Sequence, residues 1–221
     1  MKHFVLASAI VVLALGLVVT PTRGSGGGAF QLRRGAGSRF SSRRVSSPAH
    51  LRFRWDIVSY DFSANPVAVS AGGNATAIAS DDSKITFTGR GTFGGAPSHV
   101  TGGGTWQLVD ADGTAVANGT YKVTSLVSFI VAPGTFGDPT GRLELTDDIG
   151  NASDAYAGLA VLRIAYSDGS QGTLLLGSFQ VGTPPPRLMG ITATKSALAY
   201  WERQAPRPRT DGNRTLFHRI P

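Results

Sequence analysis

The chain has 221 residues, no cysteine and a formal net charge of +7. The excess charge lies in residues 1–50, which carry seven basic and no acidic side chains, whereas residues 51–221 carry 14 of each sign. The folded part therefore lacks the basic footprint of a nucleic-acid-binding protein. The missing cysteines exclude thiol catalysis and cysteine-ligated zinc, and two histidines after residue 50 are too few for a three-histidine site. We therefore expect no metal and no cofactor.

The first 24 residues have the order of a secretory signal peptide. A basic start at Lys2 precedes a largely apolar stretch over 4–19, and a polar, helix-breaking segment follows. The apolar stretch is too short for a stable membrane span, which needs about 20 residues. We therefore predict a secreted protein with a signal peptide at 1–24. Because residues 20–55 are rich in Arg and Ser and free of acids, an organelle transit peptide is the alternative.

Residues 25–50 have the composition of a basic Gly/Ser/Arg-rich linker or pro-segment. The segment contains two dibasic pairs, Arg33-Arg34 and Arg43-Arg44. In an extended segment such pairs are accessible to processing proteases. The alternative is a solvated basic arm that touches acidic polymers through charge alone.

From residue 51 onward, apolar residues alternate with polar or small ones, which is the period-two pattern of β-strands. Residues 53–57 alternate in one phase and residues 58–62 in the other, and this switch indicates a bulge. An Asp-Gly pair at 112–113 predicts a tight hairpin turn, as does the segment 167–172. Strands are expected at 85–93, 105–109, 116–129, 159–166 and 173–181, with further candidates at 142–146, 189–194 and 196–204, the last of which also fits a short helix.

A Gly-Thr-aromatic triplet recurs at spacings that suit one strand plus its turn in an antiparallel meander. The pattern is similar to that of ligand-binding antiparallel barrels such as avidins and lipocalins, and the sheet length suits the cyclase-like barrels of plants. This likeness implies an architecture and no functional residue. We predict one all-β domain over 51–221, a single antiparallel β-barrel of roughly eight strands, calycin-like or similar, with a two-layer β-sandwich as the alternative. The triplets begin at Gly91, Gly104, Gly119 and Gly134.

Residues 131–156 form a long connection, and connections of this length are usually functional or disordered. The strand that follows, 159–166, is apolar on both faces, so a further layer must cover its outer face. We expect the 131–156 loop to provide that cover over the sheet face or the barrel mouth. The apolar end of the segment 205–221 predicts that this tail also docks on the domain. The apolar anchors in the loop are Phe136, Leu143, Leu145 and Ile149.

Three aromatic residues in the predicted strands are candidates for ligand contact. Trp106, Tyr121 and Phe129 either line a ligand cavity or fill the core. Arg163 interrupts an otherwise apolar strand, where a charge is either paired or at a rim. It would either hold an acidic ligand head group inside the barrel or form an internal ion pair.

The 131–156 loop also carries the adjacent carboxylates Asp147 and Asp148. Neighbouring carboxylates in a loop bind cations, form turns and caps, or serve as catalytic acids and bases. The chain contains no nucleophile-elbow or triad signature beside them. The two aspartates are therefore candidates for ligand contact or for the site of a barrel-mouth enzyme.

Four of the five asparagines stand in glycosylation sequons, which predicts a glycoprotein if the host is a eukaryote. In a bacterial host the same triplets are turn sequences. The sequon asparagines are Asn74, Asn118, Asn151 and Asn213.

Three functional hypotheses remain open. The first is a secreted, non-catalytic barrel that binds a small apolar or amphipathic ligand, or a glycan, in an aromatic-lined interior. The second is a cyclase- or hydrolase-like enzyme with its site at the barrel mouth under the 131–156 loop. The third is a structural or host-interaction protein with a filled core. The sequence predicts no nucleic-acid partner and sets no oligomeric state.

Overall fold

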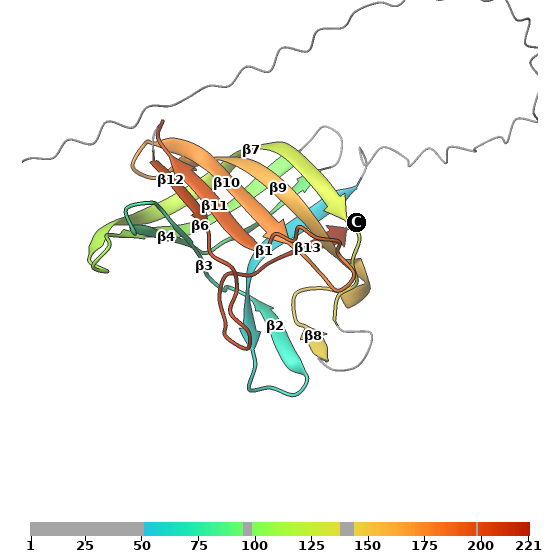
Figure 1. Ribbon diagram of the computed structural model, residues 1–221. Coiled ribbons are helices and arrows are strands. Elements are labelled where there is room, and N and C mark those ends of the chain that lie inside the picture. Colours follow the sequence, from blue (N-terminus) through green and yellow to red (C-terminus); the bar gives the residue numbers. More distant parts are fainter. Residues whose placement is uncertain (1–50, 95–98, 138–143, 198) are drawn as a thin grey trace, which may run out of the picture. The chain divides into compact units, whose positions relative to one another are not determined.

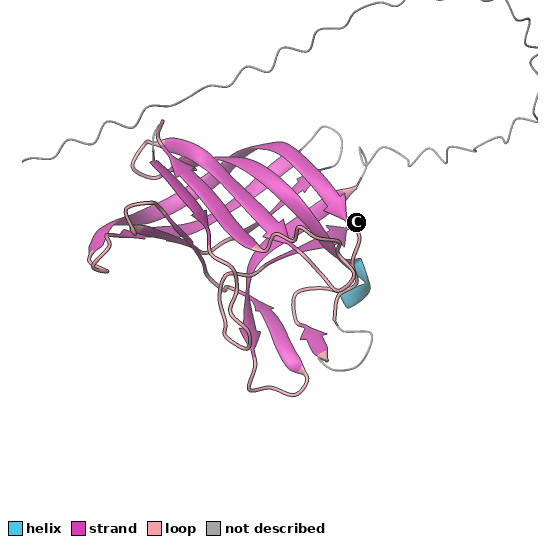
Figure 2. Cartoon of the chain, viewed as in Figure 1, coloured by secondary structure: helices cyan, strands magenta, loops and turns pink. Residues whose placement is uncertain are grey.

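The computed structural model describes residues 51–94, 99–137, 144–197 and 199–221. The predicted signal peptide, 1–24, and linker, 25–50, lie outside the described residues. In the described part, strands dominate (Figure 2). No helix in that part has the length and apolar character that crossing a membrane requires.

The described residues contain thirteen strands and one short 3-10 helix, and Figure 1 labels most of the strands. The first seven strands are β1 (Arg52–Asp61), β2 (Val67–Ala71), β3 (Ala75–Ile78), β4 (Lys84–Phe87), β5 (Arg90–Gly94), β6 (His99–Val109) and β7 (Ala115–Ala132). They are followed by β8 (Leu145–Asp147), the 3-10 helix η2 (Ala152–Asp154), β9 (Ala155–Tyr166), β10 (Gln171–Ser178), β11 (Gly190–Lys195), β12 (Ala199–Arg203) and β13 (Thr215–Ile220).

The strand pairing closes on itself. The order β10-β11-β12-β3-β4-β6-β7-β9 returns to β10, because β9 and β10 pair antiparallel. On the remaining length of β9, β13 and then β1 continue the wall to ten strands, and β5 pairs with both β1 and β6. The result is a closed antiparallel β-barrel of 10 strands with additional strands outside it. The predicted barrel is therefore confirmed in preference to the sandwich, with a strand number slightly above eight.

Both predicted hairpins are present. The Asp-Gly turn joins β6 to β7, with Gly113 at a φ of +85° and its N–H donating to the Asp110 carbonyl. The second turn joins β9 to β10, with Gly169 at a φ of +87°. The ambiguous segment 196–204 contains a strand, β12, and the apolar tail docks as β13 between β9 and β1.

The phase switch in β1 marks a change of partner rather than the bulge we expected. Up to Ile57 the strand pairs with β13 in the barrel wall, and from Val58 onward it pairs with β2 outside the wall. Both residues are completely buried, Ile57 in the barrel core and Val58 in a second apolar cluster. The two phases therefore correspond to two different hydrophobic environments along one strand.

The barrel interior is filled by side chains. Phe93, Trp106 and Tyr121 of the Gly-Thr-aromatic triplets are each 2% exposed and belong to the main core. The glycine of the second triplet permits close strand packing, because a Cβ at Gly104 would lie 2.1 Å from the Thr88 carbonyl oxygen. In the fourth triplet, Phe136 packs instead against the second cluster outside the barrel.

That second cluster lies between the barrel wall and an outer layer built from β2, β8 and neighbouring segments, which Figure 1 shows below the barrel. The long connection does cover an apolar face, as expected, but the face belongs to β1 and β13. Leu159 and Val161 on β9 stay partly exposed. The cluster is centred on Val58, Val69, Ala155 and Leu216, with Tyr60, Phe136, Leu145 and Ile149 packed around it, whereas Leu143 lies outside the described residues.

The outer layer should contribute directly to stability. Leu216 is 2% exposed in the second cluster, so Leu216→Ala should lower the free energy of unfolding by about 3 kcal/mol in urea titrations. The matched control is Ile130→Ala on the outside of β7, where the side chain is 62% exposed and the change should stay within about 0.5 kcal/mol. Equal effects of the two substitutions would show that the outer cluster adds nothing to the fold.

Candidate functional site

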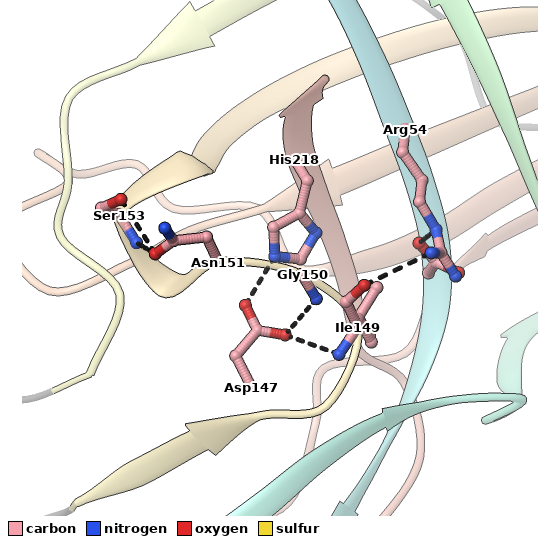
Figure 3. A network of polar contacts seen from close by, with 8 residues as sticks. Arg54, Asp147, Ile149, Gly150, Asn151, Ser153 and His218 are labelled. Carbon is pink, nitrogen blue, oxygen red and sulfur yellow. Dashed lines mark hydrogen bonds and ion pairs between the residues drawn. The ribbon is translucent and has the colours of Figure 1, made fainter. Parts of the chain in front are cut away.

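A buried aspartate–histidine pair joins the outer layer to the barrel. Asp147 Oδ2, at the end of β8, lies 2.6 Å from His218 Nε2 on β13, and the two side chains are 2% and 3% exposed (Figure 3). The other carboxylate oxygen, Oδ1, accepts hydrogen bonds from the backbone N–H groups of Ile149 (3.0 Å) and Gly150 (3.2 Å). One carboxylate thus fixes the turn after β8 and attaches it to the barrel wall.

The local sequence explains why the carboxylate lies there. Asp147 caps its own turn through the two backbone N–H groups, as aspartates commonly do. The histidine ring packs closely on that turn, since a Cβ at Gly150 would lie 3.1 Å from Cδ2 of His218. The next turn is capped in the same way by Asn151, whose Oδ1 accepts hydrogen bonds from the backbone N–H and the hydroxyl of Ser153.

An ion pair on β1 lies beside the aspartate–histidine pair. Arg54 makes a bidentate contact with Asp56 at 2.7 and 2.8 Å and donates to the Ile149 carbonyl at 3.4 Å. Arg54 is also the cross-strand partner of His218. Charged groups from β1, β8 and β13 therefore gather on the covered outer face of the wall.

Burial and hydrogen bonding shift the pKa values of Asp56 and Asp147 in opposite directions. Burial raises the pKa of Asp56 above its ordinary value, and the neighbouring Arg54 offsets this only in part. Burial also acts to raise the pKa of Asp147, but the hydrogen bonds from His218 and from the backbone outweigh it and hold that pKa below the ordinary value. The Asp147 carboxylate is therefore stabilised in its charged form.

This polar network links the outer layer to the barrel wall. The Nδ1 atom of His218 is buried and has no hydrogen-bond partner among the described residues, so no described hydroxyl is positioned on it as a nucleophile. No group of three or more potential metal ligands occurs in the described part of the chain. Asp148, the neighbour of Asp147, is exposed.

The aromatic candidates lie within the packed core. Tyr121 donates its hydroxyl to the Thr88 carbonyl (2.9 Å), and Trp106 Nε1 donates to the Thr120 carbonyl (3.2 Å), so their polar atoms are already satisfied. Phe129 packs against three other rings at centroid distances of 4.8–5.0 Å. Its partners are Phe53, Phe93 and Phe217.

Arg163 does not have the environment that the sequence suggested. It is exposed on the outer face of β9, between two buried neighbours, Leu162 and Ile164. Its cross-strand partners are Thr173 and Ser125. The expected internal ion pair is therefore wrong, because the alternation of the strand places this residue outside the barrel.

A pocket of about 300 Å3 opens where the outer layer meets the end of β10. Sequence reasoning missed it, because its walls come from segments far apart in the chain. Its lining is mainly apolar and includes Tyr60, Phe136, Leu145, Val181 and Leu216. Its polar lining residues are Thr135, Ser178, Gln180, Arg207 and Arg214.

Two of these polar residues are buried without hydrogen-bond partners. Gln180 is 7% exposed, and neither its Oε1 nor its Nε2 has a partner among the described residues; the same holds for the hydroxyl of Ser178. Unmade hydrogen bonds of buried groups cost about 1–3 kcal/mol each. The pocket wall therefore contains unused polar groups next to apolar ones.

Arg214, by contrast, donates hydrogen bonds to the backbone. Its Nη1 and Nη2 atoms donate to the backbone carbonyls of Thr210, Gly212 and Arg207. Its guanidinium lies over the rings of Tyr60 and Phe62 at 4.8 and 5.1 Å. Burial lowers its pKa and raises that of Tyr60 to about 12.

The sequon asparagines differ in their accessibility. Asn74, Asn118 and Asn151 are exposed. Asn213 is half-buried, and its Oδ1 accepts a hydrogen bond of 2.7 Å from the Thr76 N–H. A glycan on Asn213 Nδ2 would have to fit beside this contact between the tail segment and β3.

The two neighbouring aspartates allow a matched test of the buried pair. Asp147→Ala leaves His218 and two backbone N–H groups without their acceptor, so the free energy of unfolding should fall by about 3 kcal/mol. Asp148→Ala, at an exposed position, should change it by less than about 0.5 kcal/mol. Similar losses from both would contradict a specific link through Asp147.

The lowered pKa of Asp147 also gives the pair a defined pH dependence. A carboxyl group with a lowered pKa stabilises the fold above its unfolded pKa, near 3.8, and this stabilisation is lost as the pH falls through the folded value. The difference in unfolding free energy between the native chain and Asp147→Asn should therefore shrink as the pH is lowered from neutral to below 3.8. A difference that stays constant would show that Asp147 is not held charged by the fold.

Comparison with protein families, with curated proteins and with solved structures finds no match for this chain.

Proposed function

We propose that the protein is a non-catalytic binder of a small apolar or amphipathic molecule, and that the ligand occupies the pocket between the barrel wall and the outer layer. The observation that carries this proposal is a pocket of about 300 Å3 with a mainly apolar lining and buried, unused polar groups. A few polar groups within apolar walls are the usual composition of small-molecule sites. The packed aromatics of the barrel core favour this pocket over the interior as the site.

The size of the pocket limits the ligand. At about 30 Å3 per water-sized group, 300 Å3 corresponds to roughly ten nonhydrogen atoms. This is the lower end of the range for ligand pockets, which is about 300–1,000 Å3. The expected ligand is therefore a short alkyl or a single-ring compound rather than a long lipid.

A series of straight-chain alcohols from hexan-1-ol to dodecan-1-ol tests the proposal by calorimetric titration. Each added CH2 group that enters the pocket should lower Kd about fourfold, because its burial contributes about 0.8 kcal/mol. The gain should stop once the molecule exceeds about ten nonhydrogen atoms. Absence of binding, or a gain that continues to the longest alcohol, would overturn the assignment of this pocket.

Two substitutions locate the binding site. Val181 lines the pocket, so Val181→Trp should block it and abolish the dependence of Kd on chain length. Ile130→Trp is the control, since Ile130 is exposed on β7 and does not line this pocket. Binding that survives Val181→Trp unchanged would place the ligand elsewhere.

We also propose that the chain is exported and that residues 1–24 are removed. The support is the order of basic, apolar and helix-breaking residues in the leader. The exposure of Asn74, Asn118 and Asn151 is compatible with glycosylation in a eukaryotic host. Mass spectrometry of the protein from its own host tests both the removal of residues 1–24 and glycosylation, because each changes the intact mass.

A further inference from the structure

From the pocket walls we infer that the ligand carries an uncharged group that both donates and accepts hydrogen bonds, a primary amide or its equivalent, and that Gln180 recognises it. This inference rests on the proposed function and specifies the chemistry of the same pocket. It depends on three observations. The side-chain amide of Gln180 and the hydroxyl of Ser178 have no hydrogen-bond partner among the described residues, and the guanidinium of Arg214 donates to backbone carbonyls.

The backbone N–H of Gln180 makes a hydrogen bond, whereas its side-chain amide makes none among the described residues. The Gln180 N–H donates to Thr183 Oγ1 (2.9 Å), and that hydroxyl donates to the Pro133 carbonyl (2.8 Å). The side-chain amide has no partner among the described residues. An amide in this position requires a ligand that offers an acceptor to Nε2 and a donor to Oε1, which only a group with both functions supplies.

The side-chain amide atoms are themselves covered, so the Gln180 side chain has to turn toward the pocket to meet a ligand. That movement breaks no side-chain hydrogen bond, because none is present among the described residues. The rearrangement replaces two unmade hydrogen bonds with two made ones. Ser178, also on the lining, offers one further donor to the same head group.

A carboxylate fits this wall less well than an amide. It would accept from Nε2 but leave Oε1 without a donor, and its charge would be buried in a mainly apolar pocket. Three of the five N–H groups of Arg214 already donate to backbone carbonyls, so Arg214 offers a carboxylate at most two further donors. Arg207 lines the pocket as well, but it is exposed, and exposed ion pairs add little affinity.

The test compares octanamide with octanoate at neutral pH by calorimetric titration, because the two compounds have equal size and differ in the head group. The amide makes one hydrogen bond more than the carboxylate, which corresponds to about fivefold in Kd, so octanamide should bind at least about fivefold more tightly. Gln180→Met, which keeps the length of the side chain and removes the amide, should erase this preference without lowering Tm. Gln107→Met, at an exposed position on β6, is the control and should keep it.

The outcomes separate this inference from the proposed function. If Kd of the alcohols depends on chain length as expected but octanoate binds as tightly as octanamide, the proposed binding pocket is supported and the amide inference is overturned. Loss of such octanoate binding in Arg207→Gln would then assign the head group to the rim cation. An unchanged octanamide preference in Gln180→Met also overturns the inference. If neither the alcohols nor octanamide bind, both proposals fail.

Discussion

Burial of both faces of β1 and β13 is the constraint on which the rest of the structure depends. On the inner face, Trp55 and Phe217 are cross-strand partners in the barrel core and are completely buried. On the outer face, Val58 and Leu216 are equally buried, although they point away from that core. Apolar residues on both faces of a sheet require a covering layer. The segments of β2, β8 and the long connection provide that cover.

The polar network follows from the same constraint. The covering segments bring backbone groups and charged side chains into a region without water, where each needs a partner. Asp147 satisfies two backbone N–H groups and His218 at once, and Arg54 satisfies Asp56 and a loop carbonyl. Where the cover is incomplete, next to the end of β10, the pocket and the unpartnered amide of Gln180 remain. The candidate site is thus a product of how two layers meet and not of the barrel interior.

The sequence revealed the fold more readily than the site, for physical reasons. Alternation of apolar residues and the Asp-Gly turn report local geometry, so the barrel and its hairpins could be predicted. The phase switch at Ile57 and Val58 was visible, but its meaning depends on β2 and β13, which are distant in the chain. Asp147 was a candidate because it adjoins Asp148, whereas its actual partner, His218, is 71 residues away. Gln180 gave no signal, since nothing local distinguishes a buried glutamine from an exposed one.

The pairing of β1 with β13 joins the first and the last strand of the domain, as Arg52 lies opposite Ile220. Because this pairing joins residues far apart in the chain, it raises the contact order, and proteins of high contact order fold slowly. Until β13 arrives, β1 lacks one neighbour in the wall, and Trp55 and Val58 each lack part of their cover. β13 therefore contributes both to the barrel core, through Phe217, and to the attachment of the outer layer, through Leu216. A chain cut short before Thr215 would lose both together, leaving a partly folded sheet with an open edge.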